Sequence, residues 1–180
     1  MNKTAVTLKR AVPHIAAALL IIAADRVVKS LTAAYMTLYE RTELIPGLLD
    51  LTYVENTGAA LGIMKGARLF FILLTIVALA LIVFLAVRGY VRHPFGSWAL
   101  TLVTGGAIGN FIDRLLFGSV VDMFEFPFVS FAVFNVSDIF VTVGGAMCCI
   151  YFIFLHDRKL GKKDEDDFAA PPGRGSRDQT

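Results

Sequence analysis

Ionisable and amide side chains lie at the borders of two apolar runs between residues 104 and 138. A charged group at a membrane boundary costs several kcal/mol unless it is paired or hydrated, so such groups are functional candidates by default. The set comprises Asn110, Asp113, Arg114, Asp122, Asn135 and Asp138. Two carboxylates in one site share a proton, because like charges oppose full ionisation. The charged member can then activate water while the neutral member protonates the substrate, which suits peptide-bond hydrolysis.

Other common catalytic patterns are missing from the sequence, which has no HExxH motif, phosphate-binding loop or serine–histidine pair. Cys148 and Cys149 are adjacent inside an apolar run, and we interpret them as small packing residues. His14, His93 and His156 have no companions at metal-ligand spacing. We therefore expect neither a metal nor an organic cofactor, with water as the nucleophile. Spacing alone leaves open which two aspartates form a pair.

Composition indicates a membrane protein with one small domain at residues 1–160. The 180 residues are 56% apolar and 18% charged, below the roughly 25% charged residues of soluble domains, and the mean hydropathy is +0.67. The net charge of +2 gives no reason to expect nucleic-acid binding. The pattern predicts an all-α membrane protein with four transmembrane helices, at about residues 12–30, 69–87, 97–114 and 137–155. Residues 69–87 carry no charge and suffice to cross roughly 30 Å of hydrocarbon.

The first apolar run has two interpretations. A short basic segment before it fits a cleaved signal peptide, with a cleavage site near Ala23 and Ala24. We favour a retained span, because Asp25 and Lys29 continue the helical pattern four residues apart on one face. That pair is either a simple intrahelical ion pair or a polar clamp that orders the following loop, and both interpretations remain open.

The loops after the first and third spans carry most of the remaining polar and aromatic residues. Pro46 and Gly47 mark a turn, and residues 48–56 alternate as a strand does, which predicts a small β-rich cradle between spans 1 and 2. Residues 115–136 are rich in phenylalanine and serve either as a membrane anchor or as an apolar wall around a substrate. Ser137 is the expected N-cap of the fourth span, which places Asp138 in the first helical turn, where the helix dipole favours its charged form.

Positive charges predict the orientation of the spans. Lys and Arg cluster before the first span, at residues 88–93 and after the fourth span. Four spans bring these clusters to one side, and the positive-inside rule makes that side the cytoplasm. Both termini are then cytoplasmic, the β-rich cradle is extracytoplasmic and the aspartates lie near the outer face. The tail at residues 161–180 has the composition of a disordered segment.

Five stretches, in this order, resemble the lipoprotein signal peptidase (signal peptidase II) family. They are DRVVK at 25–29, NTGAA at 56–60, GGAIGNFIDR at 105–114, VVDM at 120–123 and FNVSD at 134–138. One such motif is weak, but five in order over about residues 12–155 are highly specific. The family usually has an aromatic residue where this chain has Leu61, Phe where it has Met123 and Ala where it has Ser137. Leu61 bears on the shape of the substrate cradle, whereas Met123 and Ser137 remove no polar group.

The resemblance implies an aspartyl endopeptidase of the bacterial cytoplasmic (inner) membrane, in contact with membrane lipids. We expect it to act as a monomer. Such enzymes remove the signal peptide from diacylglyceryl-modified prolipoproteins, just before the lipidated cysteine, and are inhibited by the cyclic peptide globomycin. The catalytic pair maps to Asp122 and Asp138. Supporting and substrate-binding positions map to Asn56, Gly58, Asn110, Asp113, Arg114, Asn135, Asp25 and Lys29.

Two alternatives have other functions. A small polytopic transporter or proton-coupled carrier favours charges near the bilayer midplane and internal repeats, whereas here the charges cluster at span ends and the halves do not repeat. A non-catalytic scaffold could lock its helices through Asp25 with Lys29 and Asp113 with Arg114. The scaffold leaves Asp122 and Asp138 without a cationic partner in the sequence.

Overall fold

The computed structural model describes residues 3–58, 66–91 and 93–155. Within these residues, four helices are long and apolar enough to cross a membrane, as predicted. They are α1 (Lys3–Tyr35), α2 (Arg68–Val87), α3 (Pro94–Leu116) and α4 (Val136–Ile150), which the π-helical turn η2 (Tyr151–Leu155) extends. Both α1 and α3 continue beyond the predicted spans. Leu61 and the tail at residues 161–180 lie outside the described residues.

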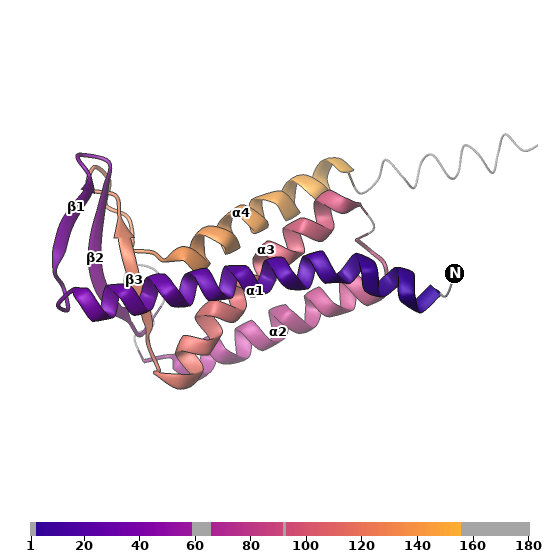
Figure 1. Cartoon of the computed structure of the whole chain (residues 1–180), viewed down its shortest axis with the longest axis horizontal. Helices are drawn as coiled ribbons and strands as arrows, with labels where there is room; N and C mark the ends of the chain where they lie inside the picture. The colour runs from indigo at the N-terminus through magenta and orange to yellow at the C-terminus, as the bar shows by residue number, and fades with distance from the viewer. Residues whose placement is uncertain (1–2, 59–65, 92, 156–180) are drawn as a thin grey trace, which may run out of the picture.

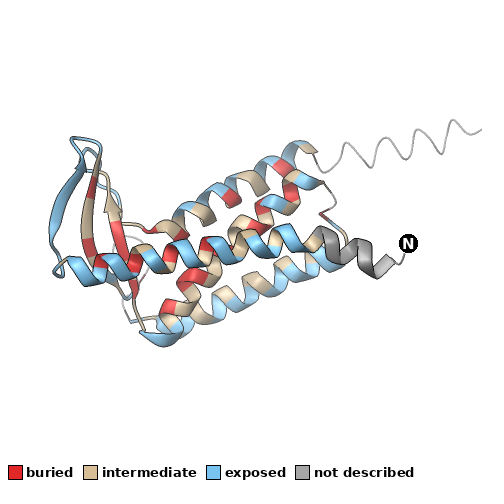
Figure 2. Cartoon of the chain, in the orientation of Figure 1, coloured by how far each residue is buried: buried red, intermediate tan, exposed pale blue. Residues whose placement is uncertain are grey.

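Helix α3 is the centre of the bundle and contacts α1, α2 and α4. Figure 2 shows buried positions gathered along α3 and near the strands, whereas α2 has no buried residue. An apolar helix exposed on this scale is stable in hydrocarbon, where its backbone hydrogen bonds are satisfied internally. Pro94 starts α3 at a position where its missing N–H costs no helical hydrogen bond.

Three antiparallel strands form a small sheet at one end of the bundle (Figure 1). The strands are β1 (Arg41–Ile45), β2 (Leu49–Asn56) and β3 (Val120–Glu125), in the order β1-β2-β3. The predicted turn lies at residues 46–48, where Gly47 has a φ of +70° that favours glycine. The predicted sheet between spans 1 and 2 is confirmed for β1 and β2. Strand β3 was not predicted, and it comes from the aromatic segment between α3 and α4.

The helix ends away from the sheet lie together at the opposite end of the bundle. Figure 1 places the start of α1, the connection between α2 and α3, and the end of α4 at that end. These are the helix ends beside the basic segments at residues 3–10 and 88–93 and after the fourth span. The four spans therefore bring the described helix ends beside these segments to one end, and Asp25, Asp113, Asp122 and Asp138 lie toward the other.

Candidate active site

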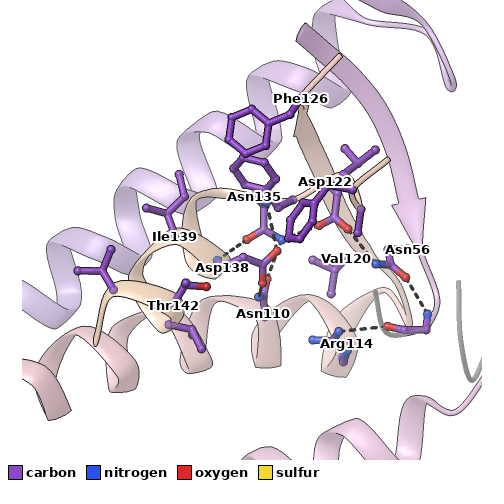
Figure 3. A pocket seen from close by; sticks show the side chains of 17 residues that line it. Asn56, Asn110, Arg114, Val120, Asp122, Phe126, Asn135, Asp138, Ile139 and Thr142 are labelled. Atoms are coloured by element: carbon purple, nitrogen blue, oxygen red, sulfur yellow. Dashed lines mark hydrogen bonds between the residues drawn. The ribbon is translucent and has the colours of Figure 1, made fainter. Parts of the chain in front are cut away.

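A cavity of about 490 Å³ lies where α3, α4 and β3 meet (Figure 3). Its wall is largely apolar, with polar groups concentrated at one place. Seven of the ten predicted site residues line it: Asn56, Gly58, Asn110, Arg114, Asp122, Asn135 and Asp138. These residues come from β2, α3, β3 and the start of α4, so segments far apart in the sequence supply one site.

Asp122 projects from β3 and is 3% exposed. Its Oδ1 accepts a hydrogen bond of 2.6 Å from the Asn135 side-chain amide, and its Oδ2 accepts one of 2.9 Å from Asn56. Burial, together with the nearby charge of Asp138, raises the pKa of Asp122 to about 7. The two amides and Lys29 offset only part of this rise. Asp122 therefore holds a proton far more readily than an exposed aspartate.

Asp138 occupies the first turn of α4, as predicted, but the N-cap is Asn135 and not Ser137. The Asn135 side chain accepts the Asp138 backbone N–H at 2.9 Å, and the Asp138 carboxylate accepts the Asn135 backbone N–H at 3.1 Å. This reciprocal capping box leaves Ser137 inside the helix. The second Asp138 oxygen accepts a hydrogen bond of 2.7 Å from the Asn110 side-chain amide. This position places the Asp138 carboxylate at the positive end of the α4 helix dipole.

The remaining predicted residues, Asp25, Lys29 and Asp113, form a buried ionic cluster behind the cavity. The Lys29 ammonium lies 2.7 Å from both Asp25 and Asp113, and it donates to the Asn110 amide oxygen at 2.8 Å. Asp25 in turn accepts the Ser137 backbone N–H at 2.8 Å. The ion pair expected within the first span is present, and it also ties α1 to α3 and to the start of α4.

Arg114 lines the cavity, and among the described residues it forms no ion pair with a carboxylate. Its guanidinium stacks over the Phe71 ring at 4.9 Å and donates a long hydrogen bond of 3.5 Å to the Gly58 carbonyl. The neighbouring Asp113 forms its ion pairs with Arg26 and Lys29 in the described part of the chain. The pairing of Asp113 with Arg114 considered for a scaffold is therefore wrong. Within the described residues, the guanidinium donates one side-chain hydrogen bond, the long one to Gly58.

The aromatic segment supplies part of the cavity wall. Phe126, Phe131 and Phe134 line the cavity, and the rings of Phe126 and Phe134 lie 5.2 Å apart. Phe117 and Phe128 are instead largely exposed. The segment thus contains both cavity-lining and exposed rings, and the membrane anchor and the substrate wall both stay predictions. Among the described residues, no group of three His, Cys, Asp or Glu side chains is placed to hold a metal ion.

Sequence reasoning missed Arg26 and the capping role of Asn135. Arg26 is three residues before Lys29, so both cations point toward α3 from one helical face. The spacing of Asn135 and Asp138 matches an acidic variant of the capping box, which was a readable signal. Ser137 was a competing cap candidate by residue type, and only the backbone shows that it lies inside the helix.

The sequence profile of the family described as Signal peptidase (SPase) II matches residues 17–154. The chain belongs to the signal peptidase II family. A lipoprotein signal peptidase of Enterococcus faecalis is 38% identical over 147 residues, covering 82% of this chain and 90% of the relative. A lipoprotein signal peptidase of Symbiobacterium thermophilum is 43% identical over 141 residues, covering 77% of this chain and 90% of the relative.

Two solved bacterial membrane enzymes, determined by the in meso method at 2.3 and 1.9 Å resolution, share the fold. The first has a TM-score of 0.72 and 30% identity, covering 91% of this chain and 94% of that chain. The second has a TM-score of 0.73 and 34% identity, covering 79% and 94%. The resemblance inferred from five motifs is confirmed, and this signal peptidase II family member is a multi-pass membrane protein. Membership of a peptidase family does not favour the carrier alternative.

Proposed function

We propose that this chain is an aspartyl endopeptidase that removes the signal peptide from diacylglyceryl-modified prolipoproteins, cutting before the lipidated cysteine. Family membership and the relatives named lipoprotein signal peptidase support the substrate class. The observation that carries the reaction is a pair of carboxylates, Asp122 and Asp138, that face one largely apolar cavity and accept hydrogen bonds from amides. Residues 1–160 form the one peptidase domain in this proposal.

The pair divides the work of an acid and a base. Asp138, at the N-terminus of α4, is the charged member and takes a proton from water as the water oxygen attacks the scissile carbonyl. Asp122 holds the shared proton and gives it to the carbonyl oxygen. As the resulting diol collapses, one of its hydroxyls returns a proton to Asp122, the C–N bond breaks and the leaving amine takes the proton that Asp138 accepted from water. The products are the signal peptide with a new carboxylate and the lipoprotein with a free amine on its cysteine.

The other cavity residues bind and orient the substrate. Arg114 has donors available for substrate carbonyl oxygens, and it lies beside Gly58. Asn56 and Asn135 hold the Asp122 carboxylate from two sides. The apolar wall around Phe126 and Phe134 suits the diacylglyceryl group and the apolar part of a signal peptide. The same cavity is the binding site for globomycin in this proposal.

The proposed orientation places the sheet and the cavity at the outer face of the bacterial inner membrane. The helix ends beside the basic segments lie at the opposite end of the bundle, which the positive-inside rule assigns to the cytoplasm. Both termini are then cytoplasmic. The exposed apolar surfaces of α1, α2 and α4 contact membrane lipids, and the protein acts as a monomer.

Cleavage of matched substrates tests this function. The purified protein in detergent is given a diacylglyceryl-modified prolipoprotein and the same precursor without lipid, with and without globomycin. The proposal predicts that only the lipidated form is cleaved, before its cysteine, and that globomycin blocks the cleavage. Equal cleavage of both forms would contradict the substrate assignment, and no cleavage of either would contradict the function.

A further inference from the structure

We propose that Lys29 is a positioning residue that sets the orientation of the Asn110 amide, so that this amide donates to the carboxylate of Asp138. The inference rests on the proposed function for its meaning, but its geometry is independent of the substrate. Within the described residues, Lys29 forms no hydrogen bond or ion pair with Asp122 or Asp138. It acts through Asn110.

Lys29 is enclosed by acceptors from two helices. Its side chain is 1% exposed, and its ammonium has contacts of 2.7 Å to Asp25, 2.7 Å to Asp113 and 2.8 Å to the Asn110 oxygen. An ammonium has three donors and no acceptor, so these three contacts use its full capacity. Because the ammonium can only donate hydrogen bonds, the groups around it must present acceptor atoms, which here are oxygens. The ammonium therefore specifies which end of the Asn110 amide faces it.

The amide of Asn110 has two different ends, and each faces a group of one kind. Its oxygen faces Lys29, and its NH₂ donates to Asp138 at 2.7 Å. The reverse orientation would place NH₂ against the ammonium and the oxygen against the carboxylate, and both hydrogen bonds would be lost. Lys29 thus favours the one orientation of the Asn110 amide in which its NH₂ donates to Asp138.

The same oxygen also orients the second amide of the site. Asn135 donates its NH₂ to the Asn110 oxygen at 3.1 Å and to Asp122 at 2.6 Å (Figure 3). The Lys29 ammonium therefore holds the Asn110 oxygen in place. That oxygen accepts a hydrogen bond from the Asn135 amide, which also donates to Asp122. The charged groups around Asp138 are Lys29 on α1, Arg114 on α3 and Asp122 on β3. Lys29 is the one among these that donates to Asn110.

A purely structural role for Lys29 would be charge balance. Lys29 and Arg26 carry two positive charges, and their partners Asp25 and Asp113 carry two negative charges. Replacing Lys29 alone would leave a buried carboxylate without its partner, which destabilises a protein strongly. A double change, Lys29→Met with Asp25→Asn, removes one charge of each sign. It retains the pair of Arg26 with Asp113, and an amide at position 25 keeps an oxygen that can accept the Ser137 backbone N–H. It removes the contacts of Lys29 with Asp113 and with the Asn110 oxygen.

The test compares Lys29→Met, the double variant and wild type in the full-length protein. The positioning role predicts that the double variant has a thermal transition close to that of wild type, that its kcat is lower by roughly 100-fold, as for loss of an oriented donor, and that its KM changes little. The acid limb of its pH–rate profile moves to higher pH, because the Asp138 carboxylate has lost a donor. Wild-type kcat with an unchanged pH profile in the double variant would overturn the proposal and leave charge balance as the role of Lys29.

Asn110→Ala covers the case in which these variants do not fold, and a double-mutant cycle extends the test when they do. Asn110→Ala keeps the ion pairs of Lys29 with Asp25 and Asp113, and it removes the amide through which Lys29 acts. We expect Asn110→Ala to lower kcat and to shift the acid limb as the double variant does. Adding Lys29→Met and Asp25→Asn to Asn110→Ala should then cause no further loss of kcat. A normal acid limb in Asn110→Ala would overturn the proposal.

A titration without substrate separates this inference from the proposed function. Infrared difference spectra of the purified protein follow the Asp138 carboxyl, with Asp138→Asn assigning its band. Loss of the Lys29 donor should make Asp138 keep its proton to higher pH, and an unchanged titration would overturn the positioning role. If wild type cleaves no prolipoprotein, the function fails, while the effect of Lys29 on Asp138 is still measured.

Discussion

The side-chain amide of Asn135 donates to the carboxylate of Asp122 at 2.6 Å, and this bond joins the start of α4 to strand β3. Asn135 simultaneously caps α4 and accepts the backbone N–H of Asp138. One asparagine thus holds both members of the proposed catalytic pair, one through its side-chain NH₂ and the other through its helix cap. A neutral amide can hold a carboxylate in place without neutralising its charge, whereas a cation would neutralise it.

Replacing Asn135 with alanine should damage stability and activity together. The lost cap costs about 0.5–2 kcal/mol, and Asp122 loses one of its two amide donors. Ser137→Ala is the matched control, because the buried Ser137 hydroxyl has no hydrogen-bond partner in the part of the chain that is described. We expect a lower melting temperature and little cleavage for Asn135→Ala, and unchanged or higher stability with normal cleavage for Ser137→Ala. Equal effects of the two changes would contradict this role of Asn135.

Gly109 allows α3 to approach both α1 and the start of α4. A Cβ added at Gly109 would collide with the Ser137 hydroxyl and lie 2.9 Å from an Asp25 oxygen. Gly109→Ala should therefore destabilise the protein by about 1–3 kcal/mol and displace the neighbouring Asn110. At Gly145 an added Cβ meets no atom within 4 Å, so Gly145→Ala should melt at the wild-type temperature or above it. Melting curves and cleavage rates of the two variants check this, and a harmless Gly109→Ala would show that the packing is looser than described.

The raised pKa of Asp122 predicts a pH-dependent stability. The folded protein holds this proton up to about pH 7, whereas the ordinary pKa is 3.8. Ionising Asp122 therefore favours unfolding, and its penalty grows as the pH rises from about 4 to about 7 and is constant above. Relative to Asp122→Asn, which cannot ionise, wild type should lose stability over this range. A stability difference that does not vary with pH would contradict the raised pKa.

Activity should also decline on the alkaline side. The proposed mechanism needs one shared proton, so kcat/KM should fall as the pH rises above an apparent pKa near 7, when the pair loses that proton. A pH–rate profile measured with the lipidated substrate checks this. Full activity that continues unchanged well above pH 8 would show that neither carboxyl acts as an acid.

Phe131 offers a test of the cavity wall apart from the chemistry. Its side chain lines the cavity and is 58% exposed, so Phe131→Ala should affect stability little. The loss of apolar contact with the substrate should raise KM several-fold while kcat changes little. Phe117→Ala is the control, since Phe117 is exposed to a similar extent outside the cavity lining. If both changes raised KM equally, the effect would come from the membrane surface and not from the cavity.

The sequence predicts the spans and the polar residues well, because both depend on simple physical rules. A charge-free apolar run such as residues 69–87 predicts a membrane span, and its boundaries agree closely with α2. Asn110 and Asp113 were expected on one helical face from their spacing, and they do meet the same lysine. These predictions are local in the chain, where periodicity applies.

The features that the sequence did not predict depend on contacts between segments that are distant in the chain. Strand β3 has no clear alternation, because Val120, Asp122 and Met123 are all buried between the sheet and the bundle. Lys29 was expected to pair with Asp25, yet its contacts with α3 involve residues more than 80 positions away. Only the packing of α1 on α3 shows those contacts. Local patterns and the family resemblance therefore indicated the candidate residues, and the fold shows which side chains they contact.

The measurement that tests the central claim most directly is cleavage of a diacylglyceryl-modified prolipoprotein by Asp122→Asn and Asp138→Asn. Melting curves confirm that each variant folds. Asp50→Asn is the matched control, since Asp50 is a buried aspartate that pairs with Arg41 on the sheet, outside the cavity lining. The account predicts that both cavity variants fold and lose cleavage by several orders of magnitude, while Asp50→Asn cleaves normally. Substantial cleavage by a folded Asp122→Asn or Asp138→Asn would contradict the assignment of this pair as the catalytic acid and base.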